Sequence, residues 1–215
     1  QQQSQEIKHL YDEGKMTRSD LESYLKKAAE SSEIILGNLS RASELIQGFK
    51  QVAVDQASGD QRTFNLKDYI DETLLSLHPE LKKTEHTVIV HCPADLEIRS
   101  FPGAFSQIIT NLVLNSLMHG FERKKRGEIL LDVSGEHGML WMRYSDNGKG
   151  MTLNEHARIF EPFYTTKRGQ GGSGLGLHIV YNLVTQQLHG TIECESLPDQ
   201  GATFIIQMPI NKEDS

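Results

Sequence analysis

The sequence has few of the features that mark disulfide-rich, membrane-spanning or nucleic-acid-binding proteins. Its two cysteines, Cys92 and Cys194, lie far apart without a metal-ligand pattern nearby, so we expect reduced thiols. No apolar run reaches the ~18 residues of a membrane span, and no signal peptide opens the chain. The formal net charge of −7 argues against a nucleic-acid surface, and the basic run ERKKRG is too short to change that conclusion.

Residues 21–53 carry an apolar repeat with the spacing of a helical bundle. The positions that step alternately by four and three residues are Leu21, Leu25, Ala28, Ser32, Ile35, Leu39, Ala42, Ile46, Phe49 and Ala53. Such a repeat predicts a long helix that needs partner helices along this seam. Ser19 followed by Glu22 predicts a capping box at its start.

We therefore interpret residues 1–57 as a dimerising helical hairpin, of which the first residues end a preceding helix and DEGKM forms the turn. A long helix packed on its own domain is the less favoured alternative. The chain begins without a Met and partway into a helix, which indicates a fragment of a longer protein.

After the linker DQASGDQ the elements become short and mixed, which indicates a second domain over residues 62–212. The pattern predicts helices that begin at Asn65, near Gly103 and near Gly174. The expected strands are 86–92, 96–100, a hairpin within 128–146, GTIECES and ATFIIQMPI. Helices interspersed with hairpin strands predict an α+β fold, a two-layer sandwich of one sheet with helices on one face, preceded by the long-helix hairpin.

One predicted helix is apolar on most sides yet carries an uninterrupted polar stripe. In QIITNLVLNSLMHG, the residues Gln107, Asn111, Asn115 and His119 fall four apart, so they share one helical face. Burying an Asn amide without a hydrogen-bond partner costs on the order of 1–3 kcal/mol. The stripe therefore either satisfies itself internally or faces a polar partner that is not protein.

Three further segments have the composition of a phosphate-binding site. SDNGKGM places two glycines around Lys149, IFEPFYTTK ends in two hydroxyls and a cation, and GQGGSGLGLHIV is a glycine-rich turn that opens a helix. Such a helix start can bind an anion. Other motifs do not fit: Gly150 stands where a Walker A loop needs Ser or Thr, no strand precedes the glycines as in a Rossmann fingerprint, and Leu175 replaces the second glycine of a nucleophile elbow.

In order, these segments read N-x-x-x-N, D-x-G-x-G, F-x-P-F-x-x-x-K and G-x-G-L-G, which resembles the Bergerat-type ATP-binding fold of sensor histidine kinases, type II topoisomerases, mismatch-repair ATPases and heat-shock chaperones. The resemblance covers roughly residues 62–210 and is greatest to the histidine kinases. Hydrolysing relatives carry a Glu, which activates water, where this chain has Asn111. An amide cannot serve as that base, which favours a kinase.

The resemblance implies an ATP and Mg²⁺ site with assigned roles. Asn115 would ligate the Mg²⁺ that bridges the phosphates, and Asn111 would contact phosphate or water. Asp146 would accept a hydrogen bond from the adenine amino group, where guanine carries an oxygen. Gly148 and Gly150 would let the chain pass beneath the base.

The other implied contacts lie mostly in a mobile lid over residues 151–174, anchored by Phe160 and Phe163. The remaining expected ATP contacts are His119, Thr165, Thr166, Lys167, Gly172, Ser173, Gly174, Leu175, Gly176, Leu177 and Thr203. Met118 departs from the family, many members of which have Lys there. His119 either supplies the missing polar contact or is a surface residue at a helix end.

The acceptor of histidine kinases lies on the first helix of the hairpin, followed by an acid and then a Pro. His9 lacks that context, so the resemblance implies an acceptor His upstream of Gln1 and no catalytic residue in this fragment. The implied activity is ATP-dependent protein-histidine kinase, with onward transfer of the phosphate to an aspartate of a response-regulator receiver domain. We expect the fragment alone to bind ATP but not to phosphorylate itself.

The implied partners are a second copy of the chain, joined through the N-terminal helices, and the receiver domain. We expect a cytoplasmic location, no nucleic acid, and membrane contact only through regions of the parent protein that are not present here. Three alternatives stay open: an ATP-hydrolysing machine of the same fold, an anti-sigma-factor-type serine kinase, and a dimerisation scaffold that binds no nucleotide. Steady ATP turnover would favour the first, and a failed nucleotide titration the last.

Overall fold

The computed structural model describes residues 11–58, 61–122, 124–167 and 172–210, and side chains within this set apart from residues 38 and 40–58. By its contacts the chain divides into two units, residues 1–48 and 49–215. The division falls inside a continuous helix, so the domain limits at 57 and 62 stay a prediction. The interpretation of His9 concerns a residue outside the described ranges.

The long helix α2 (Arg18–Ser58) begins slightly earlier than expected. Thr17 and Asp20 form its capping box: the Thr17 N–H donates to Asp20 Oδ2 at 3.0 Å, and the Asp20 N–H donates to Thr17 Oγ1 at 3.2 Å. The capping box predicted at Ser19 and Glu22 is therefore wrong by two residues, and Glu22 instead pairs with Arg18 at 2.8 Å. The predicted turn before the helix is confirmed at Gly14, which has φ +66°.

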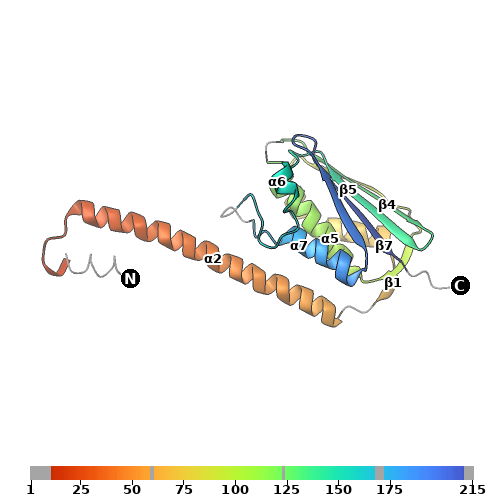
Figure 1. The fold of residues 1–215 in the computed structure, drawn as a ribbon, viewed down its shortest axis with the longest axis horizontal. Helices are drawn as coiled ribbons and strands as arrows, with labels where there is room; N and C mark the ends of the chain where they lie inside the picture. The colour runs from red at the N-terminus through yellow and green to blue at the C-terminus, as the bar shows by residue number, and fades with distance from the viewer. Residues whose placement is uncertain (1–10, 59–60, 123, 168–171, 211–215) are drawn as a thin grey trace. The chain divides into compact units, whose positions relative to one another are not determined.

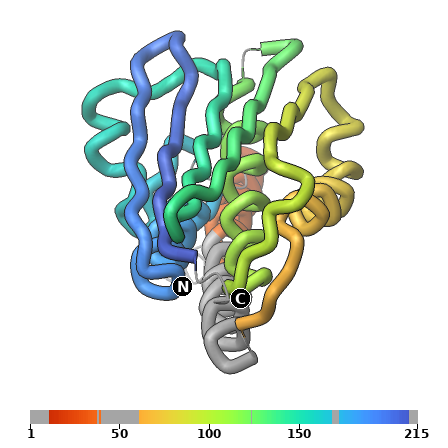
Figure 2. The backbone as a smooth tube through the Cα atoms, turned by 90° about the vertical axis from the view of Figure 1, so that its right-hand side faces the viewer, coloured from red at the N-terminus to blue at the C-terminus, as the bar shows by residue number. Residues whose placement is uncertain are grey.

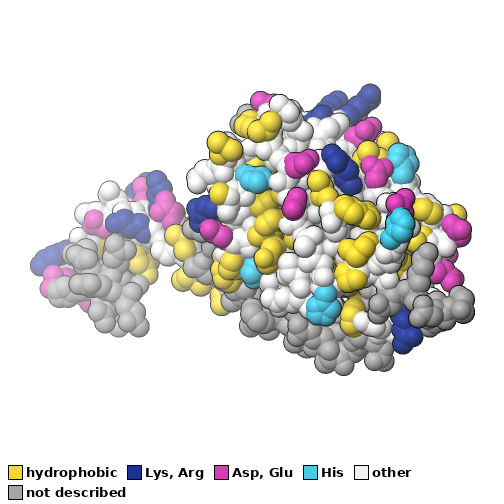
Figure 3. Space-filling model, turned by 45° about the vertical axis from the view of Figure 1, so that its right-hand side comes forward, with side chains coloured by type: hydrophobic (Ala, Val, Ile, Leu, Met, Phe, Trp, Pro, Cys, Tyr) yellow, Lys and Arg dark blue, Asp and Glu magenta, His cyan; other side chains and the backbone are white. Residues whose placement is uncertain are grey.

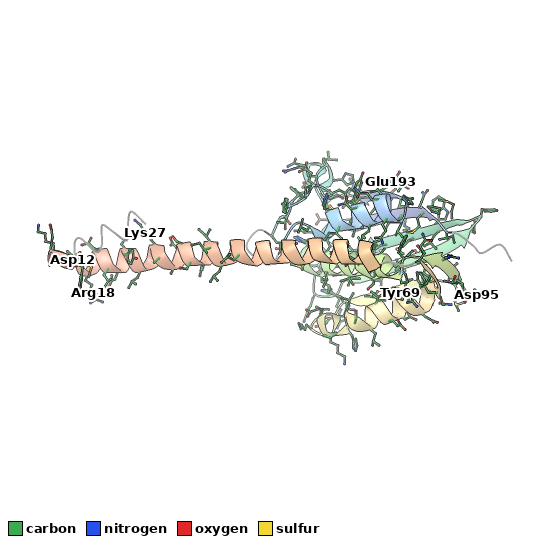
Figure 4. The ribbon with its side chains drawn as sticks, turned by 90° about the horizontal axis from the view of Figure 1, so that it is seen from below. Asp12, Arg18, Lys27, Tyr69, Asp95 and Glu193 are labelled. Atoms are coloured by element: carbon green, nitrogen blue, oxygen red, sulfur yellow. The ribbon has the colours of Figure 1, made fainter. Side chains whose placement is uncertain are left out.

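The large apolar residues in the described part of the α2 seam, up to Leu39, are open to solvent in a single chain. Leu21, Leu25, Ile35 and Leu39 are between 38% and 61% exposed. Figure 4 shows the side chains of this first half of the helix, with Arg18 and Lys27 labelled, projecting away from its axis. Helices of this kind gain most of their stability from packing an apolar face, so these four described side chains are available to partner helices.

Five strands form the main sheet, and they lie side by side in Figure 2. In spatial order they are β2 (Thr87–His91), β4 (Glu128–Glu136), β5 (Met139–Asp146), β7 (Ala202–Pro209) and β6 (Thr191–Ser196). The pairing of β2 with β4 is parallel and the other pairings are antiparallel. A separate two-stranded sheet joins β1 (Arg62–Asn65) to β3 (Glu97–Ser100).

The helices of this unit cover one face of the sheet, as Figure 1 shows for α5 and α7. The helices are α3 (Leu66–Ser76), α4 (His78–Leu81), α5 (Pro102–Asn115), α6 (Leu153–His156) and α7 (Gly176–Asn182). Tyr144 and Phe204 of the sheet, and Phe105 and Ile108 of α5, are fully buried in the shared core. The predicted two-layer α+β sandwich is confirmed, as is the N-cap at Asn65.

Two predicted helices end in wider π-helical turns that the sequence did not indicate. The segment η1 (Ser116–Gly120) continues α5, and η2 (Leu183–Gln187) continues α7. In η1 the Phe121 N–H donates to Ser116 O at 2.9 Å, five residues back. Such turns often occur at functional sites, and η1 contains both Ser116 and His119.

The described helices include no membrane span, and the face shown in Figure 3 carries charges of both signs. On the face shown in Figure 3, acidic and basic side chains are interspersed among apolar ones. Among the described helices, none has both the length and the apolarity that crossing a bilayer requires.

Candidate functional site

The polar stripe of α5 faces the glycine-rich start of α7. A Cβ on Gly176 would lie only 3.3 Å from Asn111 Oδ1, so the absence of a side chain there lets the two helices approach. Asn111 Nδ2 donates to Gln107 O at 2.9 Å, which satisfies part of the stripe within its own helix. The Asn111 oxygen is thus turned toward the first residues of α7.

Asn115 follows one turn later, at the last position of α5. Its side chain is half-exposed, and none of the described residues hydrogen-bonds its amide. An amide that is neither buried nor paired incurs no desolvation penalty, and its oxygen is available to a ligand. The stripe is therefore partly satisfied by its own helix and partly open.

Asp146, the last residue of β5, is 8% exposed and tightly held. Its Oδ2 accepts from Ser116 Oγ at 2.7 Å, and its Oδ1 accepts from the Gly148 N–H at 2.9 Å. A Cβ on Gly148 would meet Gly120 O at 2.6 Å. Glycine is therefore required for this loop to pass against the end of η1.

Two glycines at the end of the expected lid let it pack closely against residues 163–165. Gly174 has φ +72°, and a Cβ there would lie 2.5 Å from the Phe163 carbonyl carbon. A Cβ on Gly172 would meet Thr165 Oγ1 at 2.6 Å. His178 of α7 donates from Nδ1 to Phe160 O at 2.9 Å, which joins the lid at its anchor Phe160 to the helix that follows the lid.

A charged cluster connects three of the motifs. Glu122 pairs with Lys149 at 2.8 Å and with Lys167 at 3.2 Å. Hydrogen bonds from Lys149 and Lys167 lower the pKa of Glu122 from 4.5 to about 2. His119 Nδ1 lies within hydrogen-bond distance of Thr166 Oγ1, at 3.1 Å. Burial, and then the charges of Lys167 and Lys149, lower the pKa of His119 from its usual value, whereas the charge of Glu122 raises it.

Most predicted site residues in the described ranges fall into these groups, but Thr203 does not. Thr203 Oγ1 lies 3.1 Å from Ser145 Oγ. Because side chains alternate along β7 and its neighbours Ala202 and Phe204 are buried against the helices, Thr203 points to the opposite face of the sheet. Ala202, which is paired with Asp146, occupies the helix-facing position instead.

Three other predicted residues have visible structural roles. A Cβ on Gly150, at φ +64°, would meet Leu197 O at 1.9 Å, so this glycine lets the loop lie against the turn before β7. Leu175 is buried as the residue that precedes α7, and Leu177 is half-buried against the core. Residues 168–171 of the expected lid lie outside the described ranges.

Sequence reasoning missed four residues of this region. Ser116 and Tyr144 contact each other near Asp146, and Glu122 and Lys149 pair beside the lid. Lys149 could have been found from its place between two glycines. Glu122 gave no signal, because it opens the basic run ERKKRG, which was considered as a nucleic-acid surface and judged too short for one.

Comparisons with known proteins agree with this arrangement. Residues 102–212 match the family described as histidine kinase-, DNA gyrase B-, and HSP90-like ATPase. The sensor histidine kinase ZraS of Klebsiella oxytoca is 37% identical over 119 residues, which are 55% of this chain and 25% of that protein. The chain spans about a quarter of the length of such curated relatives.

Solved structures share the fold. The catalytic domain of histidine kinase ThkA has a TM-score of 0.61 at 24% identity, over 70% of this chain and 95% of that one. ThkA in complex with the response regulator protein TrrA also scores 0.61, at 22% identity, over 85% of this chain and 51% of that one. This chain belongs to the histidine kinase-, DNA gyrase B- and HSP90-like ATPase family, and it contains an ATP-binding domain of the histidine kinase type.

Proposed function

We propose that this chain is the catalytic part of a sensor histidine kinase, which binds Mg-ATP and donates the γ-phosphate to a histidine on the dimerisation helix, upstream of Gln1. The phosphate then passes to an aspartate of a response-regulator receiver domain. The observation that carries the proposal is the convergence of Asn115, Asp146 and the glycine-rich start of α7 around one end of α5.

Asp146 is proposed to recognise the adenine base by hydrogen bonding. Each of its carboxylate oxygens already accepts one hydrogen bond, from Ser116 or from Gly148, and each oxygen has a further lone pair. The adenine amino group is a donor that such a lone pair can accept. Guanine presents an oxygen at the same place, which the carboxylate repels.

The phosphates are proposed to lie between Asn115, His119 and the lid residues Thr165, Thr166 and Lys167. The open Asn115 oxygen fits Mg²⁺, which prefers oxygen ligands and is usually held by few protein groups together with phosphates and water. Among the described residues, no cluster of three His, Cys, Asp or Glu side chains offers a rival metal site. When bound, Mg²⁺ would neutralise charge on the transferring phosphates.

Asn111 supports phosphotransfer over hydrolysis. Its amide donates to the backbone of its own helix, so the group nearest the start of α7 is an oxygen with no useful basicity. Without a general base at this position, water is not activated and the γ-phosphate is kept for the protein acceptor.

Two partners complete the proposed reaction. The exposed seam at Leu21, Leu25, Ile35 and Leu39 supports pairing with the helices of a second copy. The complex of ThkA with TrrA supports a response-regulator receiver domain as the second partner. The acceptor histidine lies outside this sequence, so we propose that the chain alone does not phosphorylate itself.

The first prediction concerns nucleotide binding and transfer. In calorimetric titrations we expect heat with Mg-ATP and at least about 30-fold weaker binding of Mg-GTP. With labelled ATP, a separately added hairpin that carries the upstream histidine should become labelled, whereas the chain alone should not. Steady phosphate release without an acceptor would contradict the kinase, and absence of binding heat would contradict the whole proposal.

The second prediction concerns Glu122, which holds two lysines beside the proposed phosphate site. In Glu122→Gln the carboxylate no longer competes with phosphate for Lys149 and Lys167, so Mg-ATP should bind roughly 2- to 10-fold more tightly, as expected for exposed ion pairs. Adenosine, which has no phosphates, should bind as before. The matched control is Glu80→Gln, which breaks the exposed pair with Lys83 elsewhere on the surface. Weaker ATP binding by E122Q would mean that Glu122 positions the lysines rather than competing for them.

A further inference from the structure

Behind Asp146 lies a buried chain of hydroxyl groups that the proposed function does not use. Ser116 and Tyr144 are each 1% exposed. Ser116 Oγ lies 2.7 Å from Asp146 Oδ2 and 2.8 Å from the Tyr144 hydroxyl, and the latter lies 3.1 Å from Leu112 O. The chain thus connects the carboxylate at the end of β5 to the backbone of α5 through the core.

Counting protons determines the direction of these hydrogen bonds. An ionised carboxylate only accepts, so Ser116 must give its single proton to Asp146. The 2.8 Å contact between the two hydroxyls then needs the proton of Tyr144, which donates to Ser116 Oγ and shares the longer contact with Leu112 O. All donors therefore point toward the carboxylate, and each bond of such a chain polarises the next.

This chain holds the carboxylate in one orientation. Ser116 binds Oδ2 and the Gly148 N–H binds Oδ1, so a rotation of the carboxylate plane would break both hydrogen bonds. The glycines at 148 and 120 leave the space that Oδ1 occupies, because a Cβ on Gly148 would lie 2.8 Å from Oδ1 and one on Gly120 3.3 Å from it. The remaining lone pairs consequently have fixed directions before any ligand arrives.

The hydrogen bond from Ser116 to Asp146 also removes a possible donor to the base. A serine hydroxyl beside a base could rotate and donate to the oxygen of guanine, but here its proton is held by Asp146. The side chains of Asp146 and Ser116 therefore present only acceptors to the edge of the purine. With guanine, these acceptors and the guanine oxygen would be left without donors, and unpaired buried polar groups discriminate strongly against the wrong ligand.

We propose that Ser116, held by Tyr144, is a positioning residue that sets the selectivity of Asp146 for adenine over guanine. The inference rests on the proposed role of Asp146 in binding the base. Without the Ser116 hydroxyl, Oδ2 loses its donor and a water can replace it. A water both donates and accepts, so it can mediate binding of guanine as well as adenine.

The test measures dissociation constants of Mg-ATP and Mg-GTP for the wild-type chain, Ser116→Ala and Tyr144→Phe. We expect S116A to weaken ATP binding about 10-fold and to lower the preference for ATP over GTP about 10-fold. Y144F keeps the ring and removes only the hydroxyl, so it should lower the preference about 3-fold even if S116A does not fold. The matched control is Ser145→Ala, whose hydroxyl contacts Thr203 on the other face of the sheet, and it should leave the preference unchanged.

The outcomes separate this inference from the proposed function. If S116A or Y144F weakens ATP and GTP equally, with a lower melting temperature and the same preference, the hydroxyls are merely structural and the inference is overturned. If the wild-type chain binds neither nucleotide, the proposed function itself fails. A reduced preference in both variants, against an unchanged one in S145A, supports the inference.

Discussion

Asp146→Asn is expected to weaken Mg-ATP binding by roughly 100-fold while leaving the chain folded, since a hydrogen bond to a charged group contributes about 1.5–3 kcal/mol. An Asn can satisfy the buried network with its proton order reversed. Its oxygen accepts from the Gly148 N–H, its amino group donates to Ser116, and Ser116 donates to Tyr144, which then donates to Leu112 O. The side chain then presents a donor where adenine requires an acceptor.

Titration calorimetry checks this expectation, with thermal unfolding as the test of folding. The matched control is Asp132→Asn, which removes a carboxylate of the same sheet that pairs with His91 at 2.7 Å, away from Ser116 and Gly148. Affinity in D146N within about threefold of the wild type would show that this carboxylate does not bind the base.

Gly201→Ala is expected to destabilise the fold by about 3–5 kcal/mol, because it combines backbone strain with a steric clash. Gly201 has φ +75°, and a Cβ there would lie 1.8 Å from the carbonyl oxygen of Asp146. Since that neighbour is backbone, no side-chain rotation relieves the clash. The loop after Asp146 must move, so nucleotide binding should be lost as well.

Denaturant unfolding of Gly201→Ala and Gly138→Ala isolates the contribution of the close contact. Gly138 also has positive φ, +77°, but the nearest atom to an added Cβ is Ile210 O at 3.9 Å. Gly138→Ala should therefore cost only the strain of the left-handed backbone, about 1–2 kcal/mol. An equal decrease in the free energy of unfolding in the two variants would contradict the claim that Gly201 permits close packing against the backbone of Asp146.

Local patterns in the sequence were sufficient to predict the sandwich and the stripe on α5. Asn65 caps α3 through its own side chain, and the apolar alternation of β5 follows from the spacing of its residues. The N-cap and the apolar alternation are both set by residues that are close together in the sequence. The motifs N-x-x-x-N and D-x-G-x-G could likewise be recognised without knowing how they meet in space.

The parts that could not be predicted depend on contacts between distant residues. Ser116 reaches Asp146 across 30 positions and Tyr144 across 28, and nothing near Ser116 in the sequence indicates a buried hydroxyl chain. Thr203 was misplaced because the register of β7, which turns Ala202 toward the helices, is set by its pairing with β5. The π-helical turn η1 depends on tertiary packing and has no local signature.

The most direct test of the central claim is a crystal structure of this chain with Mg²⁺ and a non-hydrolysable ATP analogue. We expect the adenine amino group within hydrogen-bond distance of the Asp146 carboxylate, the metal on the Asn115 oxygen, and the phosphates facing the start of α7. An analogue bound elsewhere, or a base that contacts Asp146 while the metal avoids Asn115, would contradict that claim.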